Sequence, residues 1–164
     1  MSQGSSIGVA LCHTSAELKA ALEAARAGDF PYLLEPYCAG TEYAVTVTGS
    51  GNASTAFLPV EVQYAGEFFS AACKESGGYR MSEARSLSGA QCTLLQDYAK
   101  QAHRLLRATA ATRTDFIVGA DGGVHILEVN ACPGLSAHSI LPAQLALSGT
   151  RFADYLESLI GACI

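Results

Sequence analysis

The stretch that most constrains the fold is TRTDFIVGADGGVHILEVN, residues 112–130, where two apolar runs flank a strong turn signal. Asp121-Gly122 favours a two-residue hairpin turn, and a four-residue loop over 120–123 would give the same pairing of the two strands. On one side of the ribbon, this register pairs Arg113 with Asn130, Asp115 with Glu128, and Ile117 with Ile126. The other side carries Thr114, Phe116, Leu127 and Val129. The apolar residues of 125–129 predict a buried strand.

The pairing of Asp115 with Glu128 requires compensation, because two carboxylates directly opposite each other on a sheet repel. Either one carboxyl is protonated, or a cation lies between them. A hard divalent ion such as Mg2+ suits Asp115, Glu128 and Asn130, since it prefers oxygen ligands and commonly bridges to phosphate oxygens. Arg113 would then be placed to stabilise charge on a transferred phosphoryl group. Alternatively, Arg113 simply pairs with both carboxylates, and a three-residue turn would change the parity and separate these side chains.

Composition restricts the remaining classes of protein. The 164 residues are 49% hydrophobic and 15% charged, which is enough apolar material for the core of one soluble domain. The formal charge of -5 and the pI near 5.3 argue against nucleic acid or an anionic membrane as partners, and no apolar run reaches transmembrane length. The six cysteines form no C-x-x-C pair, so neither a zinc site nor a secreted disulfide scaffold is expected. We therefore expect a cytoplasmic protein.

The rest of the chain mixes helical and strand periodicity, which predicts an α+β fold. Thr14 and Glu17 fit a capping box for a helix that ends at Gly28. The other expected elements are a short strand at 32–37, a half-buried strand at 42–48 with its hairpin partner at 55–65, a long mobile loop at 70–90, a helix at 89–110, and two short helices at 139–148 and 151–162. The apolar side of the long helix is expected to carry Leu94, Leu95, Tyr98, Ala102, Leu105 and Leu106.

Four blocks resemble, in their order and approximate spacing, the ATP-grasp part of D-alanine-D-alanine ligases. These blocks are GSSIGV at 4–9, EPYCAGTEYAVTV at 35–47, RTDFIV at 113–118 and LEVNACPGLSAHSILP at 127–142. The resemblance implies an ATP-grasp-like fold over residues 1–164, with a mostly antiparallel sheet and flanking helices. The family also has a lysine-bearing strand upstream of the GSS loop and an N-terminal domain before that strand. Neither precedes Met1 here, so we expect a C-terminal ATP-grasp domain that is truncated at its N-terminus.

The resemblance also assigns roles to individual positions. The residues that match magnesium ligands, for which Mn2+ could substitute, are Asp115, Glu128 and Asn130. The implied ATP-binding residues are Glu35, Tyr37 and Cys38 at the hinge between the ATP-grasp lobes, Glu42 at the ribose, and Ser6 and Lys74 at the phosphates. Ser5 belongs to the loop that closes over phosphate and substrate, and Arg113 matches the arginine that steadies the acyl phosphate. Gly134 and Ser139 match the turn that receives the second amino acid, although Ser139 also suits a helix N-cap.

The reaction implied by the resemblance is ATP-dependent ligation of D-alanine or a similar amino acid for peptidoglycan precursor synthesis. A carboxylate attacks the γ-phosphate to give an acyl phosphate, and the amine of a second amino acid then displaces phosphate. Positioning and electrostatics carry such chemistry, so no nucleophile triad is needed.

Two departures from the family pattern bear on activity: the upstream lysine is missing, and Glu75 stands beside Lys74 where the family has tyrosine. We therefore expect a fragment that is weak or inactive alone. Its exposed apolar surface would be covered by homo-oligomerisation or by an N-terminal domain. Two other interpretations stay open: an ATP-grasp ligase with a different amino acid substrate, and a noncatalytic nucleotide-binding or assembly module.

Overall fold

The structure is a computed structural model that describes residues 4–27 and 32–161. The chain divides into two compact units: the N-terminal unit, Met1–Cys38 with Tyr64–Tyr79, and the sheet unit, Ala39–Gln63 with Arg80–Ile164. The first boundary between them falls between Cys38 and Ala39, at the predicted ATP-grasp hinge.

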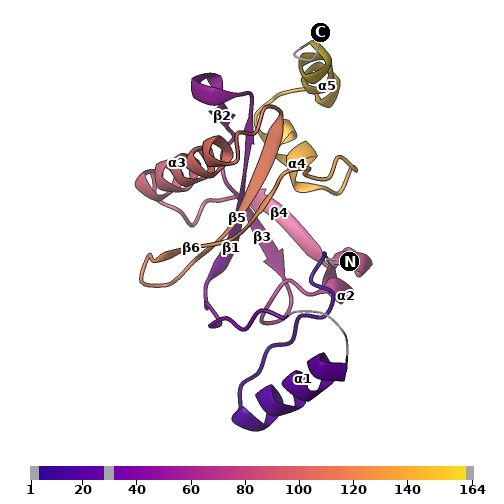
Figure 1. Cartoon of the computed structure of the whole chain (residues 1–164). Helices are drawn as coiled ribbons and strands as arrows, with labels where there is room; N and C mark the ends of the chain where they lie inside the picture. Colours follow the sequence, from indigo (N-terminus) through magenta and orange to yellow (C-terminus); the bar gives the residue numbers. More distant parts are fainter. Residues whose placement is uncertain (1–3, 28–31, 162–164) are drawn as a thin grey trace. The chain divides into compact units, whose positions relative to one another are not determined.

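The sheet unit is built on strands in the order β4-β3-β1-β5-β6, with the short β2 also paired to β1 (Figure 1). β1 pairs antiparallel with β2, β3 and β5, and β5 pairs antiparallel with β6. The strands are β1 Thr41–Thr48, β2 Thr55–Ala56, β3 Val60–Tyr64, β4 Tyr79–Glu83, β5 Ala111–Val118 and β6 Val124–Asn130. The predicted strand at 42–48, its hairpin partner at 55–65 and the hairpin at 112–130 are confirmed.

Helices cover both faces of the central strands. α3 (Gly89–Leu105) packs on one face, and α4 (Ile140–Leu147), against which α5 (Phe152–Gly161) packs, lies on the other (Figure 1). The core beneath α3 is formed by Tyr43, Val45, Val47, Leu95, Ala99, Phe116 and Val118. Because of the second helix layer, β1 is buried on both faces from residue 43 to 47, and the prediction of a half-buried strand is wrong.

α3 starts where the sequence predicts, but it ends at Leu105, and its buried side coincides only in part with the predicted apolar side. Its buried residues are Leu95, Ala99 and His103, whereas Leu94, Leu105 and Leu106 are exposed. His103 can occupy the last buried position because both ring nitrogens have partners: Nδ1 is 2.8 Å from Thr112 Oγ1, and Nε2 is 2.9 Å from the Gly49 carbonyl oxygen. Counting only apolar residues therefore placed Leu95 and Tyr98 correctly against the core, but it missed His103 and wrongly included the exposed leucines.

The hairpin partner of β1 is interrupted between β2 and β3, at 57–59, where Pro59 has no N–H to donate. Gln96 of α3 fills part of this gap, because its Nε2 donates to the carbonyls of Ala56 and Phe57 at 3.3 and 3.2 Å. Backbone groups that would pair with a neighbouring strand are thus satisfied by a side chain from the helix layer.

The N-terminal unit contains α1 (Ser15–Ala27) and α2 (Ala71–Ser76). α1 begins with the predicted capping box: Glu17 N donates to Thr14 Oγ1 at 3.2 Å, and Thr14 N donates to Glu17 Oε2 at 3.2 Å. Gly28, which was expected to end this helix, lies outside the described residues.

Two further predictions differ from the structure. Residues 32–37 form no strand and are exposed. The stretch 70–90 is not a continuous loop, since it contains α2, β4 and the start of α3. Ser70 caps α2 by accepting from Cys73 N at 3.3 Å, and Gly77 ends it with a φ of 66°. α2 and β4 are too short to show a hydrophobic periodicity that would identify them in the sequence.

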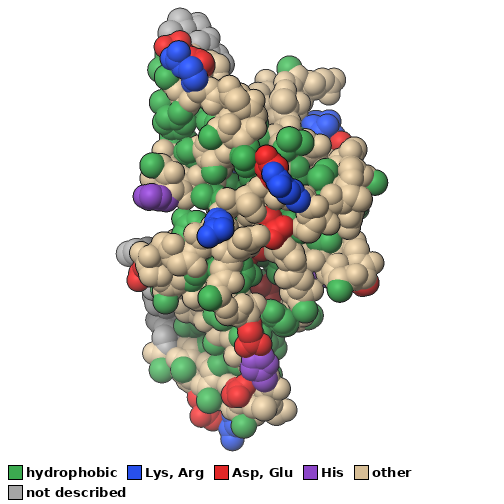
Figure 2. Space-filling view, turned by 180° about the vertical axis from the view of Figure 1, so that it is seen from behind, with side chains coloured by type: hydrophobic (Ala, Val, Ile, Leu, Met, Phe, Trp, Pro, Cys, Tyr) green, Lys and Arg blue, Asp and Glu red, His purple; other side chains and the backbone are tan. Residues whose placement is uncertain are grey.

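The two helices predicted near the C-terminus are confirmed as α4 and α5. In the described part of the chain, no helix combines the length and apolar character needed to cross a membrane. On the face that Figure 2 shows, the Lys and Arg side chains do not gather into one patch, and several of them lie beside Asp or Glu side chains. The described cysteines are all free.

Candidate active site

The hairpin of β5 and β6 brings the predicted site residues together by an unexpected route. Gly119 N donates to the Gly123 carbonyl at 2.9 Å, and Val118 pairs with Val124. The loop from 119 to 123 therefore has an odd number of residues, which alone would separate the acidic side chains. A β-bulge in β6 adds Leu127, which pairs with no residue of β5, and so restores the parity before the site is reached.

Beyond the bulge, the register is the predicted one, with Asp115 opposite Glu128 and Arg113 opposite Asn130. On the turn side of the bulge, Ile126 lies opposite Phe116 instead of Ile117. Because directly opposed residues share a face, Ile126 belongs to the α3 side of the sheet and not to the site. The third predicted pair is therefore wrong, and β6 is an exposed edge strand for most of its length, not a buried one.

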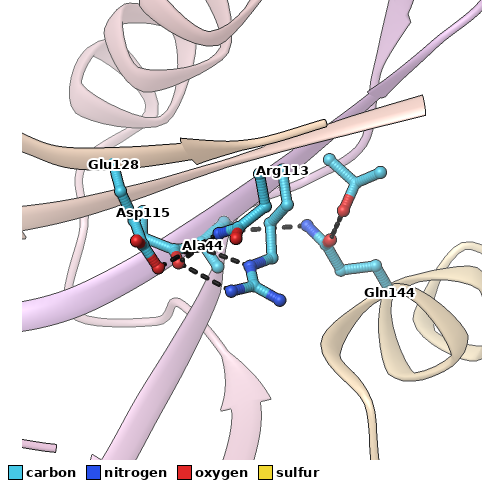
Figure 3. A network of polar contacts seen from close by, with 7 residues as sticks. Ala44, Arg113, Asp115, Glu128 and Gln144 are labelled. Atoms are coloured by element: carbon cyan, nitrogen blue, oxygen red, sulfur yellow. Dashed lines mark hydrogen bonds and ion pairs between the residues drawn. The ribbon is translucent and has the colours of Figure 1, made fainter. Parts of the chain in front are cut away.

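The four polar side chains form one network on the α4 side of the sheet (Figure 3). Arg113 Nε lies 2.7 Å from Asp115 Oδ1, and Nη2 lies 2.8 Å from Asp115 Oδ2. Asn130 Nδ2 donates to both Asp115 Oδ2 and Glu128 Oε1 at 3.2 Å. The Arg113 and Asp115 side chains are only 19% and 8% exposed, so this ion pair is shielded from solvent.

The same network raises the pKa of Arg113. Burial of the guanidinium is the largest single influence and lowers the pKa, but the hydrogen bond and charge of Asp115, with the charges of Glu128 and Glu42, together outweigh it. Arg113 therefore remains a cation throughout the pH range in which proteins are folded. The ion-pair alternative that the sequence left open is thus realised between Arg113 and Asp115, while Glu128 is bonded through Asn130.

The donor set suits a hard divalent cation. Asp115 Oδ2 and Glu128 Oε1 each lie 3.2 Å from Asn130 Nδ2, so one carboxylate oxygen from each strand already lies next to the same amide group. A half-turn of the Asn130 amide would exchange Nδ2 for Oδ1 there and complete a set of three oxygens. Among the described residues, no group of three or more His, Cys, Asp and Glu side chains is arranged to hold a metal. The two carboxylates and the amide therefore remain the candidate cation ligands.

The turn after β6 contains the two residues predicted to receive a second amino acid. Ser139 occupies the N-cap position of α4, but its side chain makes no capping bond, and its Oγ lies 2.8 Å from Ser136 Oγ. A Cβ added at Gly134 would lie 2.6 Å from Ser139 Oγ. Glycine at 134 is thus what allows the serine hydroxyl to keep its place.

Three of the predicted phosphate-side residues meet in the N-terminal unit. Ser5 and Ser6 have φ values of 57° and 60°, a conformation that is sparsely populated for non-glycine residues and clusters at ligand-binding loops. Lys74 Nζ donates to Ser6 Oγ at 2.8 Å and lies 4.6 Å from the centre of the Phe69 ring. The Ser6 hydroxyl in turn donates to the Phe69 carbonyl at 2.8 Å. Lys74, from a stretch predicted to be loop, is therefore fixed beside the serine loop.

The other predicted ATP-binding residues divide between the two units. Glu35, Tyr37 and Cys38 lie on the irregular segment that precedes the boundary. Tyr37 Oη donates to the Glu67 carbonyl at 2.8 Å within the N-terminal unit. Glu42 lies on β1 in the sheet unit, where its charge acts on Arg113.

Gln144 is a residue of this region that the sequence argument missed. Its Nε2 donates to the carbonyls of Ala44 and Leu58 at 3.1 and 2.8 Å, and its Oε1 accepts from Thr46 Oγ1 at 2.5 Å (Figure 3). In the pairing of β1 with β5, Ala44 lies opposite Asp115 and Thr46 lies opposite Arg113. The signal was present in the sequence, since one amide interrupts the apolar run ILPAQLAL and a buried amide must find partners.

Solved structures share this architecture. A D-alanine–D-alanine ligase from Bacillus anthracis superposes with a TM-score of 0.78 at 24% identity, covering 97% of this chain and 51% of that chain. D-alanyl-alanine synthetase A from Vibrio cholerae gives a TM-score of 0.65 at 27% identity, covering 77% of this chain and 39% of that chain. The antiparallel sheet with helices on both faces is therefore of the ATP-grasp class.

The family is shown by the sequence comparisons. A family model described as D-ala D-ala ligase C-terminus matches residues 1–161, and the chain belongs to this family. A D-alanine–D-alanine ligase from Desulfotalea psychrophila is 37% identical over 96% of this chain and 50% of its own length. One from Anaeromyxobacter sp. strain K is likewise 37% identical, again over 96% and 50%. The chain thus spans about half the length of the curated relatives it matches.

Proposed function

We propose that this chain provides the nucleotide-binding and cation-binding part of an ATP-dependent carboxylate–amine ligase that joins D-alanine to a second D-alanine for peptidoglycan synthesis. The observation that carries the proposal is the convergence of Arg113, Asp115, Glu128 and Asn130 on one sheet face. Family membership supports it, as do the names of the relatives, one of which is described as a Bacillus anthracis ligase complexed with ATP.

In this proposal, Asp115, Glu128 and Asn130 hold Mg2+ or Mn2+ through oxygen atoms. A bound cation would neutralise charge on the phosphate oxygens of ATP. Arg113 supplies a permanent positive charge to the phosphoryl group, because it is a cation at every relevant pH and its planar guanidinium can donate two parallel N–H groups to oxygen atoms. Ser139, which Gly134 leaves room for, offers a hydroxyl to the carboxylate of the second amino acid.

The N-terminal unit contributes the remaining contacts to ATP. Lys74 provides a cation, and Ser5 and Ser6 provide hydroxyl and backbone donors that suit phosphate oxygens. Tyr37 lies in the segment, with Glu35 and Cys38, that we assign to adenine, and Glu42 is assigned to the ribose hydroxyls. These are the donor types expected where catalysis depends on positioning and electrostatics. Since ATP is the proposed substrate, we place the protein in the cytoplasm.

Nucleotide binding is the first test, and it needs no turnover. We expect ATP with Mg2+ to raise the melting temperature of the chain, by about 2–4 °C for each kcal/mol of binding free energy. Glu128→Gln should reduce this rise, while Glu157→Gln, the same chemical change at an exposed position of α5, should not. No rise at millimolar nucleotide in a folded sample would contradict the proposal and favour a noncatalytic module.

Amino acid dependence is the second test. Because the chain spans about half the length of its relatives, we expect phosphate release well below that of a complete ligase. Any release should increase with D-alanine more than with other amino acids at equal concentration. Release that responds equally well to a different amino acid would instead indicate an ATP-grasp ligase with another substrate.

A further inference from the structure

The carboxylate of Asp115 already has most of its hydrogen-bonding positions filled. Its Oδ1 accepts from Arg113 Nε at 2.7 Å, and its Oδ2 accepts from Arg113 Nη2 at 2.8 Å and from Asn130 Nδ2 at 3.2 Å. A carboxylate offers about four such positions in all. Only 8% of the Asp115 side chain is exposed, so an approaching ion meets oxygens that face protein donors instead of water.

The carboxylate of Glu128 is more exposed than that of Asp115 and accepts fewer of the hydrogen bonds in this network. It lies on the exposed edge strand, and its Oε1 accepts from Asn130 Nδ2 at 3.2 Å. A half-turn of the Asn130 amide would release Glu128 Oε1 and one position on Asp115 Oδ2, but it would leave both bonds from Arg113 in place. Arg113 is therefore the group that competes with a cation for Asp115, because it holds both oxygens and carries charge of the same sign as the ion.

We infer that the two-pronged contact from Arg113 to Asp115 is a latch, so that cation binding at Asp115 and release of the Arg113 guanidinium are one coupled event. This inference rests on the proposed function, which assigns Asp115, Glu128 and Asn130 to a divalent cation. By thermodynamic linkage the coupling is reciprocal: a cation frees the guanidinium, and an anion that draws Arg113 away opens Asp115. Arg113 is then offered to a phosphoryl group only when the site already holds its cation, and an empty site presents a neutralised pair.

The direct test is the affinity for Mn2+ alone, without nucleotide, followed by the electron paramagnetic resonance signal of the free ion. Arg113→Lys keeps the positive charge but cannot donate two parallel N–H groups to one carboxylate. Arg113→Met removes both the charge and the donors. If the latch exists, Arg113→Lys should bind Mn2+ several-fold more tightly than the unaltered chain, and Arg113→Met about tenfold or more tightly.

The pattern across variants separates the latch from simple charge repulsion. Repulsion alone predicts that Arg113→Lys binds Mn2+ like the unaltered chain and that only Arg113→Met improves, and this result would overturn the inference. Glu128→Gln in the unaltered background tests the site itself, since it should weaken Mn2+ binding. If the affinity for Mn2+ is unchanged by Glu128→Gln, the proposed cation site is refuted. If Glu128→Gln weakens the affinity for Mn2+ but Arg113→Lys does not increase it, only the latch is refuted.

A second measurement uses the unaltered chain and so does not depend on variants that fold poorly. In an NMR experiment on arginine-labelled protein, the Arg113 Nε proton should exchange slowly with water while it is bonded to Asp115 Oδ1. Addition of Mg2+ should accelerate this exchange by at least about tenfold, because the guanidinium is released. Unchanged exchange at a Mg2+ concentration that saturates the Glu128-dependent site would show that Arg113 and the cation bind Asp115 together, contrary to the latch.

Discussion

The two strands that carry the candidate cation ligands are of opposite kinds. β5 lies between β1 and β6 with helices over both faces, and all its residues are buried except the half-buried Arg113 and Ile117. β6 is the edge of the sheet, and the side chains from His125 to Glu128 are exposed. The site thus contains one buried carboxylate, Asp115, and one exposed carboxylate at the edge of the sheet, Glu128.

Because of this difference, the two carboxylates should contribute differently to folding stability and to cation binding. Asp115 belongs to the fold as well as to the site, since it neutralises a largely buried guanidinium. Within the described part of the chain, the hydrogen bond to Glu128 comes from Asn130, and the strand of Glu128 contributes little buried surface. Residues of the site on β5 should therefore affect both stability and binding, whereas those on β6 should affect binding alone.

The largest effect is expected for Asp115→Ala. Removing one partner of a shielded ion pair leaves an uncompensated buried charge, which should lower the free energy of unfolding by about 3 kcal/mol. Glu128→Ala on the edge strand should lower it by no more than about 0.5 kcal/mol. Urea unfolding followed by circular dichroism measures both, provided that the denaturant slopes agree. Equal losses for the two variants would abolish the distinction between the strands.

A smaller loss of stability is expected for Gln144→Met. This substitution tests whether the hydrogen bonds from Gln144 to β1 stabilise the part of the sheet that carries Arg113 and Asp115. Methionine retains most of the volume but leaves the buried carbonyl of Ala44, the partly buried carbonyl of Leu58 and the buried hydroxyl of Thr46 without the partner that Gln144 provides. We expect a loss of about 2 kcal/mol. Gln96→Met is the matched control, because Gln96 also donates to two backbone carbonyls, those of Ala56 and Phe57, but is only partly buried. Its loss should be about 1 kcal/mol or less, and a ranking in the reverse order would contradict this account of the support.

The sequence predicted the pairing of the polar side chains on β5 and β6 better than it predicted the burial of these strands. Two apolar runs on either side of the Asp121-Gly122 turn signal identified both strands, and the carboxylates at 115 and 128 were correctly placed opposite each other. That success came from two errors that cancelled, because the actual loop is odd-numbered and the bulge at Leu127 corrects it. A bulge requires only one unpaired residue, and no residue pattern in β6 marks where it will occur.

Burial was the least predictable property. Ile126 and Leu127 suggested an interior strand, but whether an apolar strand is central or at an edge depends on which other strands lie beside it. The buried side of α3 was predicted only in part, because His103 satisfies both ring nitrogens and occupies an interior position while Leu105 and Leu106 are exposed. Gln144 could be found only by asking where a lone amide in an apolar helix satisfies its donors.

Deletion of Leu127 tests whether the edge strand tolerates change. The pairs on either side of the bulge, Phe116 with Ile126 and Asp115 with Glu128, would then become consecutive, so both carboxylates should remain opposite each other. We expect a loss of stability of about 1 kcal/mol or less, since the deleted residue is about half exposed and has no partner on β5. Cation binding, measured with Mn2+, should survive the deletion. Complete loss of binding in a folded protein would show that the bulge itself aims Glu128.

The smallest effect on stability is expected for Glu128→Gln, and it is the change that isolates binding from folding. The amide has nearly the same shape as the carboxylate, and removal of a negative charge opposite Asp115 relieves repulsion, so unfolding in urea should be unchanged or shifted in favour of the folded state by up to about 0.5 kcal/mol. Affinity for Mg2+ with ATP should nevertheless fall, because a neutral amide oxygen is a weaker ligand for a hard cation. If the two strands differ as described, this substitution should lower the affinity for Mg2+ with ATP without lowering the free energy of unfolding. A variant that binds the nucleotide as well as before, with no gain in stability, would mean that Glu128 neither repels Asp115 nor contributes to a cation site, and that the edge strand takes no part in the chemistry.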